Sequence, residues 1–245
     1  MAKPAVFLIG ADKGGVGKTT VARTLLDYFD ARHVPTRAFD TESPRGTLRR
    51  FYPEVTEVVD VTSAADQMKI FDTLSNADAK LTVIDVRAGR LLSTLQALSD
   101  IGFLELGRTG QITLAMFHVL GPSVASLEEI AETARFVGDA NYFLVKNHIN
   151  ETTFFEWDQE TYKSYFKKIK DAQDVAIPKL NEMACEQVEL AGVPYVSFVD
   201  SKKYSFVLRG YVRHWLGQVW REFDRVRLVE LISQKSERNI RQAAS

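Results

Sequence analysis

The stretch ADKGGVGKTT, residues 11–20, constrains the fold of this chain more than any other part of its sequence. The apolar run PAVFLIG (4–10) comes directly before it, and a helix-forming run begins at about residue 18. A glycine-rich turn between a buried strand and a helix presents several backbone N–H groups at the helix N-terminus, where the helix dipole attracts anions. The stretch therefore predicts a strand–loop–helix unit that binds phosphate groups.

Apolar runs of this kind alternate with segments of helical periodicity along the chain. The expected strands are 4–10, 36–40, 54–61, 81–86, 111–119, 141–147 and 194–199. The expected helices are 18–31, 63–77, 91–102, 123–138, 158–173, 179–191 and 204–235. Strands rich in Val, Ile and Phe without alternation are buried on both faces, and intervening helices form right-handed crossovers. The pattern predicts an α/β fold with a doubly wound, mostly parallel sheet and helices on both faces.

The composition is that of an ordinary globular protein and excludes several other classes. Hydrophobic residues make up 45% and charged residues 26% of the 245 positions, as is usual for a soluble domain. A single cysteine, Cys185, excludes a disulfide framework and a cysteine-clustered metal site within one chain. The sequence contains neither a run of about 18 apolar residues nor a signal peptide. We therefore expect one domain over residues 1–245, located in the cytoplasm.

The loop at 11–20 matches the phosphate-loop pattern G-x-x-x-x-G-K-[ST] at all but one position. In that pattern the lysine reaches the β- and γ-phosphates and the following hydroxyl ligates Mg²⁺, and Lys18 and Thr19 stand at these places. Asp12 replaces the first glycine, but three other glycines remain in the loop. The residues of this pattern expected to contact nucleotide are Gly14, Gly15, Val16, Gly17, Lys18, Thr19 and Thr20.

The run KGGVGKTT also resembles the signature loop of the ParA/MinD family of P-loop ATPases, which carry a deviant Walker A motif. In that family the first lysine, here Lys13, contacts the nucleotide held by the other subunit of a sandwich dimer. The resemblance implies ATP and Mg²⁺ as ligands, an ATP-dependent homodimer, and catalytic roles for Lys13 and Lys18. A cation that enters beside the β/γ bridge neutralises charge that develops during phosphoryl transfer, as an arginine finger does.

Two further segments resemble the nucleotide-sensing switches of this family. FDTESPRGTL (39–48) places Asp40 where the family has its catalytic aspartate, which orients water and the Mg²⁺ shell. LTVIDVRAG (81–89) resembles the Walker B strand, in which Asp85 would hold a magnesium-bound water. The implied metal-site residues are thus Thr19, Asp40 and Asp85. The residues after both aspartates depart from the family pattern, so slow, partner-stimulated hydrolysis is expected.

The end of another expected strand, KNHIN (146–150), carries a candidate base-contacting residue. The family has an asparagine here that hydrogen-bonds the purine, and Asn147 takes its place; the alternative is that Asn147 only ends the strand. A guanine site would carry N-K-x-D, whereas Asn150 stands at the position of that aspartate, which favours adenine. Residues 176–198 resemble the late segment of the family, whose proline-containing loop closes over the base.

The C-terminal region is basic although the whole chain has a net charge of −1. Residues 201–245 hold ten Lys or Arg and four Asp or Glu, a net charge of about +6, so the remainder carries about −7. Basic side chains bind nucleic-acid phosphates without sequence preference, although a solvated helix face has the same composition. Candidate DNA contacts are Lys202, Lys203, Arg209, Arg213, Arg221, Arg225 and Arg227.

These features together favour a positioning ATPase that cycles on DNA or the nucleoid and is released by an activating partner protein. Partition, plasmid stability and conjugation are typical settings. One alternative is a MinD-like membrane matrix, because residues 223–241 carry an apolar stripe, which a final core helix would also show. Another is a biosynthetic or metallocofactor enzyme on the same fold. The aromatic-rich segment 150–178 is either a partner-binding face or a peripheral part of the core.

Overall fold

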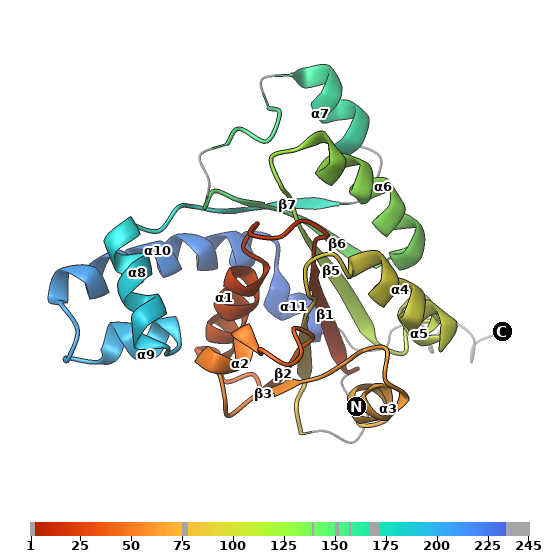
Figure 1. The fold of residues 1–245 in the computed structure, drawn as a ribbon, viewed down its shortest axis with the longest axis horizontal. Coiled ribbons are helices and arrows are strands. Elements are labelled where there is room, and N and C mark those ends of the chain that lie inside the picture. Colours follow the sequence, from red (N-terminus) through yellow and green to blue (C-terminus); the bar gives the residue numbers. More distant parts are fainter. Residues whose placement is uncertain are drawn as a thin grey trace.

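One parallel sheet, with strand order β3-β2-β4-β1-β5-β6-β7, organises the part of the chain that the structure describes (Figure 1). This computed structural model describes residues 3–74, 78–138, 140–149, 152–156, 158–166 and 172–233. Each pairing between neighbouring strands is parallel. The predicted doubly wound α/β fold is confirmed, and the described sheet is parallel throughout.

The strands are β1 (Ala5–Gly10), β2 (Thr36–Asp40), β3 (Thr56–Val58), β4 (Leu81–Asp85), β5 (Thr113–Val119), β6 (Asn141–Asn147) and β7 (Gln173–Ile177). The helices are α1 (Lys18–Asp30), α2 (Thr47–Phe51), α3 (Ala64–Phe71), α4 (Leu91–Asp100), α5 (Phe103–Arg108), α6 (Val124–Val137), α7 (Gln159–Phe166), α8 (Glu182–Ala191), α9 (Tyr195–Asp200), α10 (Phe206–Arg225) and α11 (Leu228–Ser233). The first six strands lie where the sequence predicts them, although β3 is shorter than the expected run.

The strand expected at 194–199 is wrong, because these residues form helix α9. The buried side chains of α9 are Tyr195, Phe198 and Val199, and this spacing of three and four marks one face of a helix. The seventh strand is instead β7, which was not predicted from the sequence. Only Val175 and Ile177 are buried in β7, because it lies at the sheet edge and presents polar residues to solvent.

The long helix expected at 204–235 is divided into α10 and α11. The chain breaks at Arg227, whose φ of 57° lies in the left-handed region. Val226, Leu231 and Ile232 of the apolar stripe are each at most 8% exposed and belong to the core. The described part of that stripe is therefore core, not a membrane-binding surface. Residues 234–241, which complete the stripe, lie outside the described residues.

The core has two parts, one on each face of the sheet. Side chains of β1 alternate between them, with Phe7 and Ile9 on one face and Val6 and Leu8 on the other, and all four are fully buried. Figure 1 shows α1, α8, α9, α10 and α11 on one side and α3, α4, α5 and α6 on the other. Helices on both faces explain why β1 is continuously apolar.

The aromatic segment expected at 150–178 contributes partly to the core. Phe154 is 2% exposed and packs edge-on against His148 with a ring-centroid distance of 5.2 Å. Phe155 and Tyr165 pack at the margin of the same core. These three residues fit the peripheral-core alternative. Trp157 and the side chains of Tyr162 and Phe166 lie outside the described residues.

The sheet order brings the carboxyl ends of β2, β4 and β1 side by side. Asp40 at the end of β2 is in register with Asp85 at the end of β4, and Asp85 is in register with Ile9 of β1. The glycine loop leaves β1 at this same edge. In open parallel sheets, ligands bind at the carboxyl ends of the strands.

Candidate nucleotide-binding site

The glycine loop adopts a conformation that its glycines make possible. Gly15 and Gly17 have φ values of 74° and 91°, in the region that disfavours residues with a Cβ atom. Helix α1 begins directly after Gly17. A Cβ at Gly17 would overlap the side-chain amide of Asn147, so this position also lacks space for a side chain. The loop is thus shaped by backbone conformation at Gly15 and by both conformation and packing at Gly17.

A cavity of about 320 Å³ lies over this loop at the carboxyl edge of the sheet. Its walls bring together the start of α1, the ends of β2 and β4, and the segments that follow them. The lining residues are Gly15, Gly17, Lys18, Thr19, Thr20, Asp40, Glu42, Asp85, Val86, Arg87, Ala88 and Ile149. Most of the site residues expected from the sequence therefore surround one space.

Lys18 is nearly buried, at 8% exposure, and its ammonium group donates a 2.9 Å hydrogen bond to the carbonyl of Lys13. Burial lowers the pKa of Lys18, and nearby carboxylates, Asp85 first among them, oppose this shift. The lysine is held above its own loop by a neutral acceptor. An incoming phosphate oxygen can replace that acceptor, and the resulting charge-assisted bond is stronger.

Thr19 and Asp85 form the polar floor of the cavity. The Thr19 hydroxyl donates a 2.7 Å hydrogen bond to Oδ2 of Asp85, while Oδ1 of Asp85 is buried and has no hydrogen-bond partner among the described residues. Burial raises the pKa of Asp85 to about 7. A hydroxyl, a carboxylate and an orphaned carboxylate oxygen beside a phosphate loop fit Mg²⁺, which prefers oxygen ligands and keeps several waters.

Asp40 is held by the segment that follows it. Its Oδ1 accepts the N–H of Glu42 at 2.9 Å, and its Oδ2 accepts those of Leu48 at 2.6 Å and Arg49 at 3.3 Å. Burial raises the pKa of this carboxyl group. Asp40 thus caps helix α2 while it also lines the cavity. A direct role in catalysis or metal binding remains a prediction.

Thr41 connects the two switch-like segments, a role that the sequence analysis missed. Its N–H and hydroxyl both donate to the carbonyl of Asp85, at 3.0 and 3.1 Å. Its hydroxyl also accepts the N–H of Arg87 at 2.8 Å. The only sequence signal for this contact is a hydroxyl residue directly after the strand that ends in Asp40.

Asn147 lies beneath the loop. It is 4% exposed, and its amide donates a 3.1 Å hydrogen bond to the carbonyl of Val16. Val16 itself is buried in the core and offers only its backbone to the site. Asn147 does not line the phosphate cavity, whereas Ile149 does. The contact between Asn147 and a purine stays a prediction, and Asn150 lies outside the described residues.

Lys13 points away from the phosphate cavity of its own chain. It is exposed and lines a separate cavity of about 510 Å³ beside helix α6, together with Glu128, Glu129 and Glu132. The adjacent Gly14 is also exposed. The two lysines of the loop therefore serve different surfaces of the molecule.

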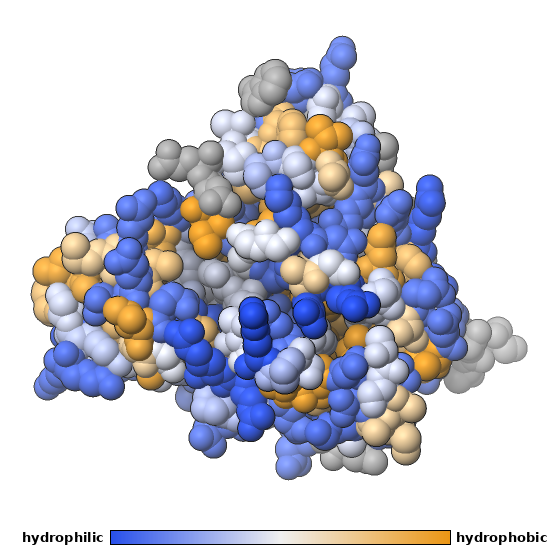
Figure 2. All heavy atoms as spheres, viewed as in Figure 1, coloured by the Kyte–Doolittle hydropathy of each residue, from blue (hydrophilic) through white to orange (hydrophobic). Residues whose placement is uncertain are grey.

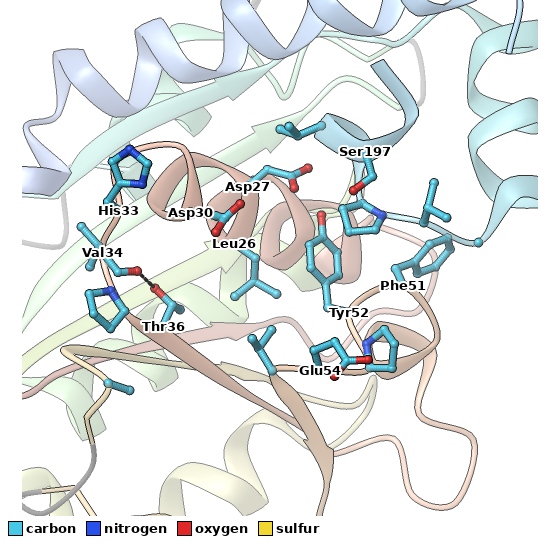
Figure 3. A pocket seen from close by; sticks show the side chains of 18 of the residues that line it. Leu26, Asp27, Asp30, His33, Val34, Thr36, Phe51, Tyr52, Glu54 and Ser197 are labelled. Carbon is cyan, nitrogen blue, oxygen red and sulfur yellow. Dashed lines mark hydrogen bonds between the residues drawn. The ribbon is translucent and has the colours of Figure 1, made fainter. Parts of the chain in front are cut away.

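A larger cavity, of about 910 Å³, lies at the opposite edge of the sheet (Figure 3). Thr36 at the start of β2 lines it, whereas Asp40 at the end of β2 lines the phosphate cavity. Its walls are mainly apolar. Its buried carboxylate, Asp27, accepts the backbone N–H of Tyr195 at 3.0 Å and so caps α9. Residues 11–20 do not line this cavity, so the smaller one is the candidate nucleotide site.

Metal-ligating clusters and long apolar helices are both absent from the described residues. Within the described residues, no group of three or more His, Cys, Asp or Glu side chains could hold a metal ion by itself. No described helix is long and apolar enough to cross a lipid bilayer.

No protein-family model matches the chain. It is 23% identical over 193 residues to protein MobD of Acidithiobacillus ferrooxidans, which covers 77% of this chain and 83% of that protein. Among solved structures it is similar to the septum site-determining protein MinD of Pyrococcus horikoshii OT3 complexed with Mg-ADP, with a TM-score of 0.57, 15% identity and coverage of 95% and 100%. It is also similar to a ParA family ATPase of Chlorobium tepidum TLS, with a TM-score of 0.54, 13% identity and coverage of 86% and 98%. The chain therefore has the fold of the ParA and MinD P-loop ATPases that its signature loop resembles.

Proposed function

We propose that this protein is an ATPase that binds Mg-ATP at the glycine loop. The observation that carries the proposal is the convergence of Lys18, Thr19 and Asp85 on one small cavity at the carboxyl edge of the sheet. Loop N–H groups and Lys18 would hold the β- and γ-phosphates. Mg²⁺, when bound at Thr19 and Asp85, neutralises charge that develops on the phosphates. Asp40 would orient the attacking water.

Calorimetric titration with ATP and Mg²⁺ tests this site. Lys18→Ala should abolish binding, because it removes the cation that faces the phosphates. Lys3→Ala, at a lysine that does not line the cavity, serves as the matched control and should bind normally. Unchanged ATP affinity in a folded Lys18→Ala protein would overturn the site assignment. GTP should bind more weakly than ATP, since Asn150 stands where a guanine site would carry an aspartate.

ATP binding would produce a homodimer in which Lys13 acts across the interface. Lys13 is exposed and lies outside its own phosphate cavity, so it cannot serve its own nucleotide without a rearrangement of the loop. The MinD protein of like fold is complexed with Mg-ADP, which supports nucleotide binding by this fold. Hydrolysis would be slow, because the residues after Asp40 and Asp85 depart from the family pattern, and an activating partner protein would accelerate it.

The matrix on which the dimer cycles would be DNA, for partition, positioning or conjugative transfer of DNA or cargo. The structure narrows the basic contacts proposed from sequence. Arg209 and Arg225 donate to the backbone carbonyls of Val199 and Asp174, and Arg225 also pairs with Glu222. Five other described basic residues of this region are exposed, namely Lys202, Lys203, Arg213, Arg221 and Arg227. These would give non-specific, salt-sensitive binding.

An anionic lipid surface is the second candidate matrix, and one observation favours it. At the start of α10, Phe206 and Val207 are 78% and 59% exposed, next in sequence to the exposed Lys202 and Lys203. Figure 2 shows hydrophobic and hydrophilic residues interspersed at this end of the molecule, over α8 and α10. DNA retardation and sedimentation with anionic liposomes, each with ATP and with ADP, separate the two candidates.

A further inference from the structure

Asp12 occupies the position at which a phosphate loop ordinarily has glycine, and the structure gives this carboxylate a use. Its Oδ1 accepts the backbone N–H of Leu91 at 2.9 Å. Leu91 is the first residue of α4, whose own N-cap residue, Arg90, makes no side-chain capping bond. The phosphate loop therefore caps a helix that follows the Asp85 strand, 79 positions further along the chain.

The backbone of Asp12 makes two more bonds in the same region. Its carbonyl accepts the N–H of Gly89 at 2.7 Å, and its own N–H donates to Oε1 of Glu129 at 2.8 Å. A Cβ built at Gly14 would lie 3.8 Å from the Cβ of Ala88, so the loop also packs against this segment. Residues 88–91 are thus attached to the phosphate loop through side chain, backbone and packing together.

Glu129 in turn lies beside a buried histidine. It lies on α6 at 8% exposure, and its Oε1 is 3.3 Å from Nε2 of His118, which is fully buried on β5. Nδ1 of His118 is 2.6 Å from the hydroxyl of Tyr142 on β6. Glu129 is itself nearly buried and accepts the N–H of Asp12 at 2.8 Å. The start of the phosphate loop is therefore fixed from α6 on one side and bonded to the 88–91 segment on the other.

We propose that Asp12 is a positioning residue that couples the phosphate loop to the segment 86–92, so that nucleotide bound by the loop orders this segment. The inference rests on the proposed ATPase function and adds a route by which nucleotide binding reaches the second switch-like segment. Val86, Arg87 and Ala88 of this segment line the phosphate cavity. Their position affects hydrolysis, while Lys18 and the loop glycines bind phosphate without the Asp12 side chain.

The coupling predicts a separation between binding and turnover. Asp12→Gly restores the ordinary loop pattern and removes the acceptor for Leu91. Its affinity for the non-hydrolysable analogue AMPPNP should stay within about threefold of wild type, since the phosphate-binding groups are intact. The kcat for ATP should fall about tenfold or more with little change in KM. Asp12→Asn keeps an oxygen acceptor for the same N–H and should restore most of the kcat.

Hydrogen exchange supplies a readout that simple loss of stability does not mimic. In the wild-type protein, AMPPNP with Mg²⁺ should slow exchange in peptides that cover residues 86–92. In Asp12→Gly the loop should still be protected by AMPPNP, but the slowing of 86–92 should be lost. Glu129→Ala should act in the same direction, and Glu129→Gln, which retains an acceptor, should not. If Asp12→Gly does not fold, the Glu129 pair and Asp12→Asn carry the test.

The matched control is Asp60→Gly, which removes another carboxylate that accepts a backbone N–H, that of Thr62, on an exposed loop. It should leave the exchange of 86–92 unchanged. Retention of the nucleotide-induced slowing in a folded Asp12→Gly protein would overturn the inference. AMPPNP binding by the wild type without slowing of 86–92 would overturn it alone, whereas absence of AMPPNP binding would remove the proposed function as well.

Discussion

The side-chain amide of Asn147 donates a hydrogen bond to the carbonyl of Val16, which joins the end of β6 to a phosphate loop 131 positions earlier. The same amide fills the space where a Cβ at Gly17 would lie. Asn147 and Gly17 therefore form a matched pair, in which the absence of a side chain on one permits the close approach of the other.

Gly17→Ala should abolish nucleotide binding, because the new methyl group overlaps Asn147 and the φ of 91° disfavours any Cβ. Gly15→Ala is the matched control. Its φ of 74° carries a similar backbone cost of about 1–2 kcal/mol, yet nothing lies within 4 Å of the added Cβ. Calorimetry with ATP should show that Gly15→Ala retains weakened binding. Equal loss in the two variants would contradict the steric argument.

Mg-nucleotide affinity should rise with pH through about 7. Burial raises the pKa of Asp85 to about 7, so at pH 6 this carboxyl is mainly protonated and bears no charge for Mg²⁺. At pH 8 it is mainly ionised. Titrations with Mg-ADP between pH 6 and 8 should show this trend in the wild type and lose most of it in Asp85→Asn. A pH-independent wild-type affinity would contradict a metal role for Asp85.

Asp27 should make the fold less stable as pH rises. Burial raises its pKa from 3.8 to about 7, so the folded protein retains a proton that the unfolded chain has released. The free energy of unfolding should then fall between about pH 4 and 7, by up to about 4 kcal/mol from this group. Asp27→Asn keeps an acceptor for Tyr195 and should raise the Tm at pH 8 but not at pH 4. Thermal unfolding at both values checks this, and ATP affinity should not change.

Lys13→Ala should leave ATP binding by the monomer largely intact and lose ATP-dependent dimerisation and hydrolysis. The reason is geometric, since the Lys13 side chain lines the cavity beside α6 and not the phosphate cavity. Light scattering with and without ATP reports the oligomeric state. Lys3→Ala, at an ordinary lysine outside both cavities, is the control. Full ATPase activity of monomeric Lys13→Ala would refute action across a dimer.

DNA binding should depend on the exposed basic residues around α10 and not on those already engaged. Combined replacement of Lys202, Lys203 and Arg213 by Ala should weaken retardation of non-specific DNA and flatten its salt dependence. Arg225→Ala removes a charge that already pairs with Glu222 and should have a smaller effect. A loss from Arg225→Ala equal to that from Arg213→Ala alone would show that net charge, and not position, decides binding.

The parts of the fold that follow from sequence are those with one strong local signal. The glycine loop, β1 and the Asp85 strand are marked by continuous apolar runs that end at the same edge of the sheet. In contrast, α9 was misassigned because a run of six apolar and small residues fits both the helical and the strand period. The strand β7 was missed because an edge strand carries polar residues. Burial of Tyr195, Phe198 and Val199 shows that tertiary packing decided the helix.

The residues of the site likewise fall into those with a local sequence signal and those without one. Lys18, Thr19 and Asp85 carry clear sequence signals, because the glycine-loop motif contains the first two and an apolar strand ends at the third. The contacts of Asp12 with Leu91 and of Thr41 with Asp85 join segments 79 and 44 positions apart. Pairing at such separations leaves no trace in a single sequence. Glu129 was missed for this reason, since on α6 it resembles any other glutamate of an amphipathic helix.

The sheet order has a consequence for synthesis of the chain on the ribosome. Strand β1 lies at the centre of the sheet and pairs with β4 and β5. Because β1 is synthesised before both, it has no strand to pair with until residues 81–85 have left the exit tunnel. The contact between the phosphate loop and Asn147 on β6 can form only later, when β6 has been synthesised. A nascent chain that stops short of β6 therefore carries the complete signature motif without the Asn147 amide that contacts the loop at Val16 and Gly17.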